Sequence, residues 1–204
     1  TRNGMTISRD SKLGNSTKVT YFSMGKDTSI SQESYDRMTM YIGASGWGEF
    51  IIGEEPEIIK LQPDELLIVP AGTLCGMQTS NGIVYTEIIC TGKDINMNAN
   101  VKTNEVFALK NLISYEEGSI ANMDVVSTPD MKYVLMAFDE GTGLTPHRAP
   151  GNAIVFALEG KATIGYEGKD YELSEGECFR FEKNGLHSVT ANGKFKMALL
   201  LVLE

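Results

Sequence analysis

The chain contains only two histidines, His147 and His187, and their spacing suits a shared site. His147 follows Gly141 in a Gly-x5-His pattern, and His187 ends a segment that begins with Gly176-x5-Glu182. Imidazole nitrogens bind divalent transition metals, exchange protons near neutral pH and accept hydrogen bonds from small ligands. His147 and His187 are therefore the candidate residues for one ligand-binding site.

Short apolar strands must position these side chains. The second half alternates β-branched or aromatic runs with turns built from Gly, Asn and Asp, which is typical of an all-β protein. Predicted turns at Glu159-Gly160 and Asn192-Gly193 each separate two strands. The expected strands of the second half are residues 133–138, 153–158, 162–166, 171–173, 178–181, 188–191 and 195–203.

The first half of the sequence repeats the second. Residues 61–75 align without gaps with residues 173–187, which places Cys75 at the position of His187. The Gly25-x5-Ser31 pattern likewise matches Gly141-x5-His147. A repeat of this length indicates two copies of one domain rather than a solenoid. We predict an N-terminal domain over 1–100 and a C-terminal domain over 101–204, joined within the polar stretch 91–103.

These patterns identify the chain as a member of the cupin superfamily. The match rests on His147, His187 and the Pro70-Ala71-Gly72 turn of the first half. In particular, the duplicated chain resembles a two-domain bicupin. The resemblance implies two tandem cupin barrels with the RmlC-like jelly-roll fold, also called a double-stranded β-helix. It also implies a homodimer.

The resemblance further implies a metal centre of which this chain keeps half. Cupins of this kind hold iron, manganese, nickel or zinc with a His-x-His pair, a Glu and a final His. Here His147 and His187 occupy the first and last positions, whereas Ala149 and Ala153 occupy the other two. Methyl groups cannot bind a metal, so substrate, water or a nearby group would have to complete the coordination shell.

The N-terminal domain has no histidine at its four corresponding positions, so we expect it to lack metal ligands. Those positions hold Ser31, Glu33, Arg37 and Cys75. Glu33 and Arg37 could form an ion pair or a ligand clamp across the barrel. The apolar neighbours of Cys75 favour a buried, unreactive thiol.

Three functions are compatible with this pattern. The first is a small-molecule-binding bicupin with a pocket in the C-terminal barrel around His147 and His187, with or without a divalent metal. The second is a metal-dependent cupin enzyme of the oxygenase or isomerase type. The third is a metal-free acid/base enzyme that resembles the sugar epimerases of this superfamily. Whether the protein is an enzyme stays open.

Composition excludes several other classes. The net charge is −9, from 18 Lys and Arg against 27 Asp and Glu, and basic residues do not cluster. We therefore expect no nucleic-acid partner, because binding phosphates requires clustered cations. Apolar runs are too short to span a membrane. Three cysteines without Cys-x-x-Cys spacing indicate a reducing compartment, so we expect a cytoplasmic protein.

Overall fold

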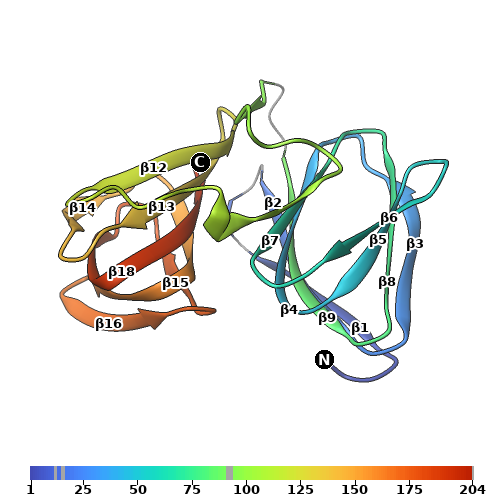
Figure 1. Cartoon of the computed structure of the whole chain (residues 1–204), viewed down its shortest axis with the longest axis horizontal. Coiled ribbons are helices and arrows are strands. Elements are labelled where there is room, and N and C mark those ends of the chain that lie inside the picture. Colours follow the sequence, from blue (N-terminus) through green and yellow to red (C-terminus); the bar gives the residue numbers. More distant parts are fainter. Residues whose placement is uncertain (12, 15–16, 91–93, 204) are drawn as a thin grey trace. The chain divides into compact units, whose positions relative to one another are not determined.

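The chain folds almost entirely into β-strands. A computed structural model describes residues 1–11, 13–14, 17–90 and 94–203. These divide into two compact units: residues 1–91 with 99–108, and residues 92–98 with 109–204. The helical element of the described chain is a single 3-10 turn, η1 (Leu109–Asn111). The predicted all-β class is confirmed (Figure 1).

The first unit contains two antiparallel sheets. The six-stranded sheet has the order β1 (Thr6–Ser11), β2 (Lys18–Met24), β9 (Ile83–Ile89), β4 (Thr39–Gly46), β7 (Glu65–Val69) and β11 (Val106–Ala108). The four-stranded sheet has the order β3 (Thr28–Ser34), β8 (Leu74–Thr79), β5 (Gly48–Ile52) and β6 (Glu57–Leu61). Both sheets contribute alternate side chains to one buried cluster, as expected when sheets pack face to face.

The second unit forms one antiparallel sheet of eight strands. The main order is β10 (Asn96–Met97), β12 (Ile120–Ser127), β13 (Met131–Phe138), β18 (Leu186–Val202), β15 (Asn152–Tyr166) and β16 (Lys169–Ser174). In addition, β14 (Gly143–Arg148) pairs with β18, and β17 (Cys178–Phe181) pairs with β15. The apolar end of the sequence therefore lies in a central strand, between β13 and β15.

Two strands run through positions where the sequence predicts turns. Gly160 lies inside β15, and the Asn192-Gly193 pair lies inside β18. Gly160 has a φ of 76° and Gly193 a φ of 86°, so both bend the chain without ending the strand. A Cβ on Gly160 would lie only 2.1 Å from the carbonyl oxygen of Lys194. The glycine is therefore needed where the backbones of the two paired long strands approach closely.

Near residue 100 the chain passes into the second unit and back into the first before it finally continues in the second. Residues 92–98, which include β10, belong to the second unit, and residues 99–108, which include β11, belong to the first. The predicted boundary at residue 100 stays a prediction, and part of the expected 91–103 connector lies outside the described residues. Among the residues described, none belongs to a helix of the length and apolarity that a membrane crossing requires.

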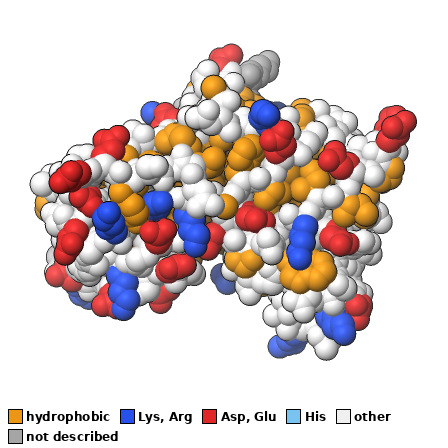
Figure 2. Space-filling model, viewed as in Figure 1, with side chains coloured by type: hydrophobic (Ala, Val, Ile, Leu, Met, Phe, Trp, Pro, Cys, Tyr) orange, Lys and Arg blue, Asp and Glu red, His pale blue; other side chains and the backbone are white. Residues whose placement is uncertain are grey.

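Charged side chains of both signs are interspersed over the surface. On the face drawn in Figure 2, Lys and Arg lie scattered among Asp and Glu. All eight ion pairs found between described residues involve at least one largely exposed partner, so each contributes little to stability, on the order of 0–1 kcal/mol.

Candidate functional site

The structure brings the two predicted histidines together. His147 of β14 lies directly opposite His187 of β18 in the antiparallel ladder, and their ring centroids are 4.2 Å apart. His187 is 7% exposed, whereas His147 is exposed. Phe181 stacks on the other side of the His187 ring, with a centroid distance of 4.2 Å and an interplanar angle of 26°. The pair thus lies where the apolar interior of the second unit meets solvent.

Backbone carbonyls set the tautomer of both rings. Nδ1 of His147 lies 2.8 Å from the carbonyl oxygen of Thr145, and Nδ1 of His187 lies 2.9 Å from that of Gly185. A carbonyl oxygen only accepts, so each Nδ1 carries the hydrogen. The Nε2 lone pairs are then left for a ligand or a proton, the arrangement that also orients metal-binding imidazoles.

Burial keeps His187 neutral. Removal of the ring from water lowers the pKa of His187 below its usual value, the hydrogen bond to the Gly185 carbonyl opposes this, and the neighbouring His147 lowers it further. At neutral pH the buried imidazole is therefore an acceptor at Nε2 rather than a cation.

The donor set around these rings does not fit the complete metal centre that the cupin resemblance implies. Within the described part of the chain, no group of three or more His, Cys, Asp or Glu side chains could hold a metal ion. Cys178 and Glu182 are potential donors near the histidines in the sequence, but Cys178 pairs across the sheet with Phe156, and Glu182 forms an ion pair with Arg180 at 3.1 Å. Metal binding by the two histidines stays a prediction.

The interior of the second unit is filled by apolar side chains. Val155, Ile164, Phe181 and Met197 belong to one buried cluster there. A hollow of about 240 Å³ reaches the His187 ring beside Tyr166 and Leu186, but His147 does not line it. The expected pocket enclosing both histidines therefore stays a prediction.

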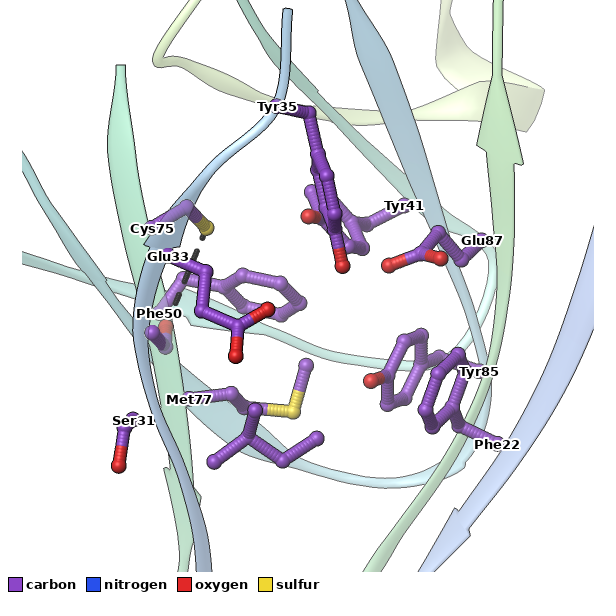
Figure 3. A pocket seen from close by; sticks show the side chains of 12 residues that line it. Phe22, Ser31, Glu33, Tyr35, Tyr41, Phe50, Cys75, Met77, Tyr85 and Glu87 are labelled. Atoms are coloured by element: carbon purple, nitrogen blue, oxygen red, sulfur yellow. Dashed lines mark hydrogen bonds between the residues drawn. The ribbon is translucent and has the colours of Figure 1, made fainter. Parts of the chain in front are cut away.

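A larger group of polar and aromatic side chains surrounds one cavity in the first unit. A cavity of about 220 Å³ lies between its two sheets (Figure 3). The six-stranded sheet contributes residues of β2, β4 and β9, and the four-stranded sheet contributes residues of β3, β5 and β8. The lining consists of Phe22, Ile30, Ser31, Glu33, Tyr35, Tyr41, Phe50, Cys75, Gly76, Met77, Tyr85 and Glu87.

Two carboxyl groups line this cavity, one buried in its interior and one at its opening. Glu87 of β9 is 5% exposed and points inward between Tyr41 and Tyr85, whereas Glu33 of β3 is exposed (Figure 3). Alternation along β9 puts Tyr85 and Glu87 on the same face of the strand. Tyr41 lies opposite Glu87 in the neighbouring strand. The cavity therefore has an acidic, aromatic interior that reaches solvent near Glu33.

Burial raises the pKa of Glu87 to about 7. Desolvation is the main cause; the positive charge of Lys18 opposes it, and the negative charges of Asp10 and Glu33 add to it. A carboxyl group with this pKa exchanges its proton near neutral pH, unlike an ordinary glutamate. Such shifted groups gather at functional sites more often than elsewhere.

The tyrosines and the cysteine of the cavity keep their protons. Burial, with the charges of Glu87, Glu33 and Cys75 as further causes, raises the pKa of Tyr35 to about 12. Burial also raises the pKa of Tyr41 and Tyr85. For Cys75, burial raises the pKa to about 11, and the hydrogen bond with Tyr41 opposes it. The cavity therefore offers hydroxyl and thiol donors and no activated nucleophile.

The strand registers show which positions correspond in the two units. Glu33 lies opposite Cys75 in β3 and β8, just as His147 lies opposite His187 in β14 and β18. In both β3 and β14 the register shifts immediately before this residue, which is how a β-bulge redirects a side chain. Glu33 and Cys75 thus occupy the places of the two histidines.

This corrects the match between Ser31 and His147. The sequence alignment paired Gly25 with Gly141, but the left-handed turn that precedes the strand is formed by Asp27 (φ 57°) and Gly141 (φ 77°). Aspartate tolerates this conformation better than most residues, so the glycine is not needed in the first unit. Glu33 follows Asp27 at the spacing at which His147 follows Gly141.

Sequence reasoning missed most of the cavity. It singled out Ser31, Glu33 and Cys75, which line the cavity, and Arg37, which does not. It did not identify Glu87 or the tyrosines. One signal was present: Glu87 interrupts the apolar run Ile83–Ile89, and a carboxylate at a core position of a strand requires an explanation.

Comparisons with known proteins agree with this architecture. Residues 134–203 match the family model described as a cupin domain. The Cupin 2 conserved barrel domain protein from Leptotrichia buccalis has a TM-score of 0.87 and 25% identity, over 99% of this chain and 91% of that one. No curated protein matches the sequence of this chain.

More distant structures share the fold. Salicylate 1,2-dioxygenase from Pseudaminobacter salicylatoxidans has a TM-score of 0.69 at 10% identity and covers 92% of this chain and 71% of that one. A cupin superfamily protein from Desulfitobacterium hafniense has a TM-score of 0.51 at 18% identity and covers 53% of this chain and 99% of that one. Residues 134–203 thus match a cupin domain, and nearly the whole chain shares its fold with a cupin barrel domain protein.

Proposed function

We propose that this cupin binds a small molecule in the cavity of its first unit. The observation that supports the proposal is the group of aromatic rings, hydroxyls and two carboxyl groups around one space of about 220 Å³. Ligand sites are usually concave and largely apolar, with a few polar groups that converge on the ligand. A space of this size suits a molecule smaller than a typical drug.

A methyl group in the wall provides a direct test. Met77 lines the cavity, whereas Met197 lies in the buried cluster of the second unit. The protein labelled with ¹³C at its methionine methyl groups should show a shift of the Met77 signal when a small organic ligand binds, with Met197 unchanged. A set of small cations, neutral molecules and anions covers the ligand classes.

Blocking the rim supplies the matched control. Glu33→Trp puts a bulky ring at the mouth and should abolish the Met77 response. Glu57→Trp introduces the same ring at an exposed position of β6 and should leave the response intact. If Met77 responds to no ligand class, or responds equally in both variants, the proposed binding function is wrong.

The acid/base alternative finds a candidate group in this cavity. Glu87, with a pKa near 7, meets the requirement that a general acid or base titrates near working pH. If the cavity catalyses proton transfer, a carbonyl substrate incubated in D₂O will exchange its α-hydrogens faster with the native protein than with Glu87→Gln. Equal exchange rates would exclude Glu87 as the base for that substrate.

The histidine pair remains a second proposed contact site. Both Nε2 atoms are left free by the carbonyl contacts of Nδ1, so the pair can accept hydrogen bonds from a ligand. The salicylate 1,2-dioxygenase likeness shows the fold, and oxygenase chemistry in this chain would need donors beyond His147 and His187. The homodimer also stays a prediction.

A further inference from the structure

The cavity of the first unit is walled by aromatic rings. The Phe22 and Tyr85 rings stack at 4.9 Å, and the Tyr41 and Phe50 centroids are 4.7 Å apart. The Tyr85 ring lies 6.0 Å from Tyr41 and 6.1 Å from Phe50. Tyr35 adds a ring beside the two carboxyl groups (Figure 3). The faces of such rings carry partial negative charge and attract cations.

The charged groups of the cavity all have the same sign. Glu87 and Glu33 line it, and the lining contains no Lys, Arg or His among the described residues. Glu87 is buried, and within the described part of the chain its carboxyl group has no hydrogen bond or ion pair. Burial makes the ionised carboxylate costly, and a positive charge beside it would offset that cost.

We propose that the ligand of this cavity is a small organic cation, held through its ammonium group by the aromatic rings and by Glu33 and Glu87. The inference rests on the proposed binding function and names the class of ligand. Aromatic walls suit an alkylated ammonium group, which sheds water more readily than a metal ion does. A bare metal ion would need several oxygen, nitrogen or sulfur donors, and no three His, Cys, Asp or Glu side chains of the described chain are arranged to hold one.

The same groups disfavour anions. A carboxylate ligand, such as an aromatic acid, would face Glu33 and Glu87 with no cation to pair with. Like charges in a site with little water repel strongly. A neutral ligand would receive the hydrogen bonds of the tyrosines but would leave the Glu87 carboxylate uncompensated above its pKa.

Binding of a cation must also displace a proton. A positive charge beside Glu87 favours its ionised form, so the carboxyl group loses its proton when the ligand enters below the pKa of the free protein. The groups that face or influence Glu87 are Lys18 and Asp10 on one side and Glu33, Tyr35, Tyr41, Cys75 and Tyr85 around the cavity. Burial raises the pKa of Glu87 to about 7, so this group can release a proton near neutral pH.

Three molecules of similar shape test the charge requirement. Choline carries a quaternary ammonium group, 3,3-dimethyl-1-butanol replaces its nitrogen by carbon, and pivalate is an anion of comparable bulk. Calorimetry with the full chain at pH 6 should show choline binding about tenfold or more tighter than the neutral alcohol, and no binding of pivalate. Repetition in buffers of different ionisation enthalpy should show proton release with choline.

Two carboxamide variants place the effect in the cavity. Glu87→Gln and Glu33→Gln keep the side-chain shape and should weaken choline binding severalfold, and Glu87→Gln should abolish the proton release. Glu57→Gln removes an exposed carboxylate of the same unit and should change neither. Glu87→Gln removes a buried carboxylate, so loss of folding is not expected from it.

The outcomes separate the ligand class from the site. If the alcohol or pivalate shifts the Met77 methyl signal and binds as tightly as choline, the cation inference is overturned and the binding cavity survives. Unchanged choline binding in Glu87→Gln and Glu33→Gln also overturns it. If none of the three molecules shifts Met77, both the cation inference and the binding proposal fail.

Discussion

Corresponding strands of the two units pair in the same registers, but the side chains that fill the space between the strands differ. In the ladders, Tyr41 lies opposite Glu87 in the first unit, and Val155 lies opposite Leu199 in the second. At the next inward position of the last strand, the first unit has Tyr85 and the second has Met197. The same framework therefore holds either a polar cavity or an apolar core.

This difference shows that strand registers and interior chemistry are set by different residues. The bulge before Glu33 and the one before His147 are equivalent, although the side chains they redirect are different. The left-handed turn is likewise equivalent, although Asp27 forms one and Gly141 the other. Backbone devices of this kind preserve the fold while the inward residues change.

The largest effect on stability should come from removing a buried aromatic ring from the packed core of the second unit. Phe181 is 1% exposed, stacks on His187 and belongs to the buried cluster of the second unit, so Phe181→Ala removes a packed ring and leaves a hole there. We expect a loss of about 3–5 kcal/mol in the free energy of unfolding. Urea denaturation followed at the Met197 methyl signal measures it. Tyr171→Ala, at a residue that is 40% exposed, should cost much less.

The next largest effect on stability should come from replacing the buried carboxyl group of the first unit by an apolar side chain. Glu87→Leu puts into the first unit the residue type that Leu199 supplies in the second. The pKa of Glu87 is raised from 4.5 in the unfolded chain to about 7 in the folded protein. The ionised carboxylate therefore lowers the stability of the fold most above pH 7. At pH 8.5 the variant should therefore gain about 3 kcal/mol, and the gain should shrink as the pH falls toward 4.5.

Urea denaturation at several pH values, followed at Met77, measures this gain. Glu57→Leu, at an exposed carboxylate, is the control and should show no comparable pH dependence. A gain at pH 8.5 that persists unchanged at pH 4.5 would mean that packing, rather than the charge of Glu87, is responsible.

A smaller effect of opposite sign is expected at His187. Its folded-state pKa is lowered, so the unfolded chain binds a proton more readily than the folded chain does. The stability of the second unit should therefore fall as the pH drops below about 6.5. His187→Gln should flatten this fall, whereas the Glu87→Leu change in the first unit should not. An equally steep fall in His187→Gln would assign it to other groups.

The smallest effect concerns metal ions. Two imidazoles bind a divalent ion weakly when the described residues supply no third donor, so zinc or nickel should raise the unfolding temperature little. Any binding detected by calorimetry should disappear in both His147→Ala and His187→Ala. Tight binding that survives either substitution would place the metal elsewhere, and no binding at all would remove the metal prediction.

The sequence was sufficient to predict the all-β architecture and the proximity of one pair of residues. Alternating apolar runs predicted the β-class, and the histidine spacing predicted that His147 and His187 would meet. It predicted turns at Gly160 and Gly193 where strands continue, because a glycine that bends a strand and a glycine that ends one look alike in sequence. The pattern does not state which of the two occurs.

The cavity was harder to predict because its walls come from six strands. Tyr41, Tyr85 and Phe50 are ordinary core residues when each is taken alone, and only their arrangement leaves a space. Glu87 was the detectable exception, since an isolated carboxyl group in an apolar strand is unusual. Glu87 also lies at none of the four cupin ligand positions, so the family motif does not point to it.

The exchanged segments near residue 100 have a consequence for the independence of the two halves. The strand β11 completes the edge of the first sheet beside β7, and it is encoded after β10, which already belongs to the second unit. A protein cut at residue 100 would therefore strip β11 from the first half and β10 from the second. Each fragment would carry a strand edge that is paired in the intact chain, and such a bare edge invites self-association.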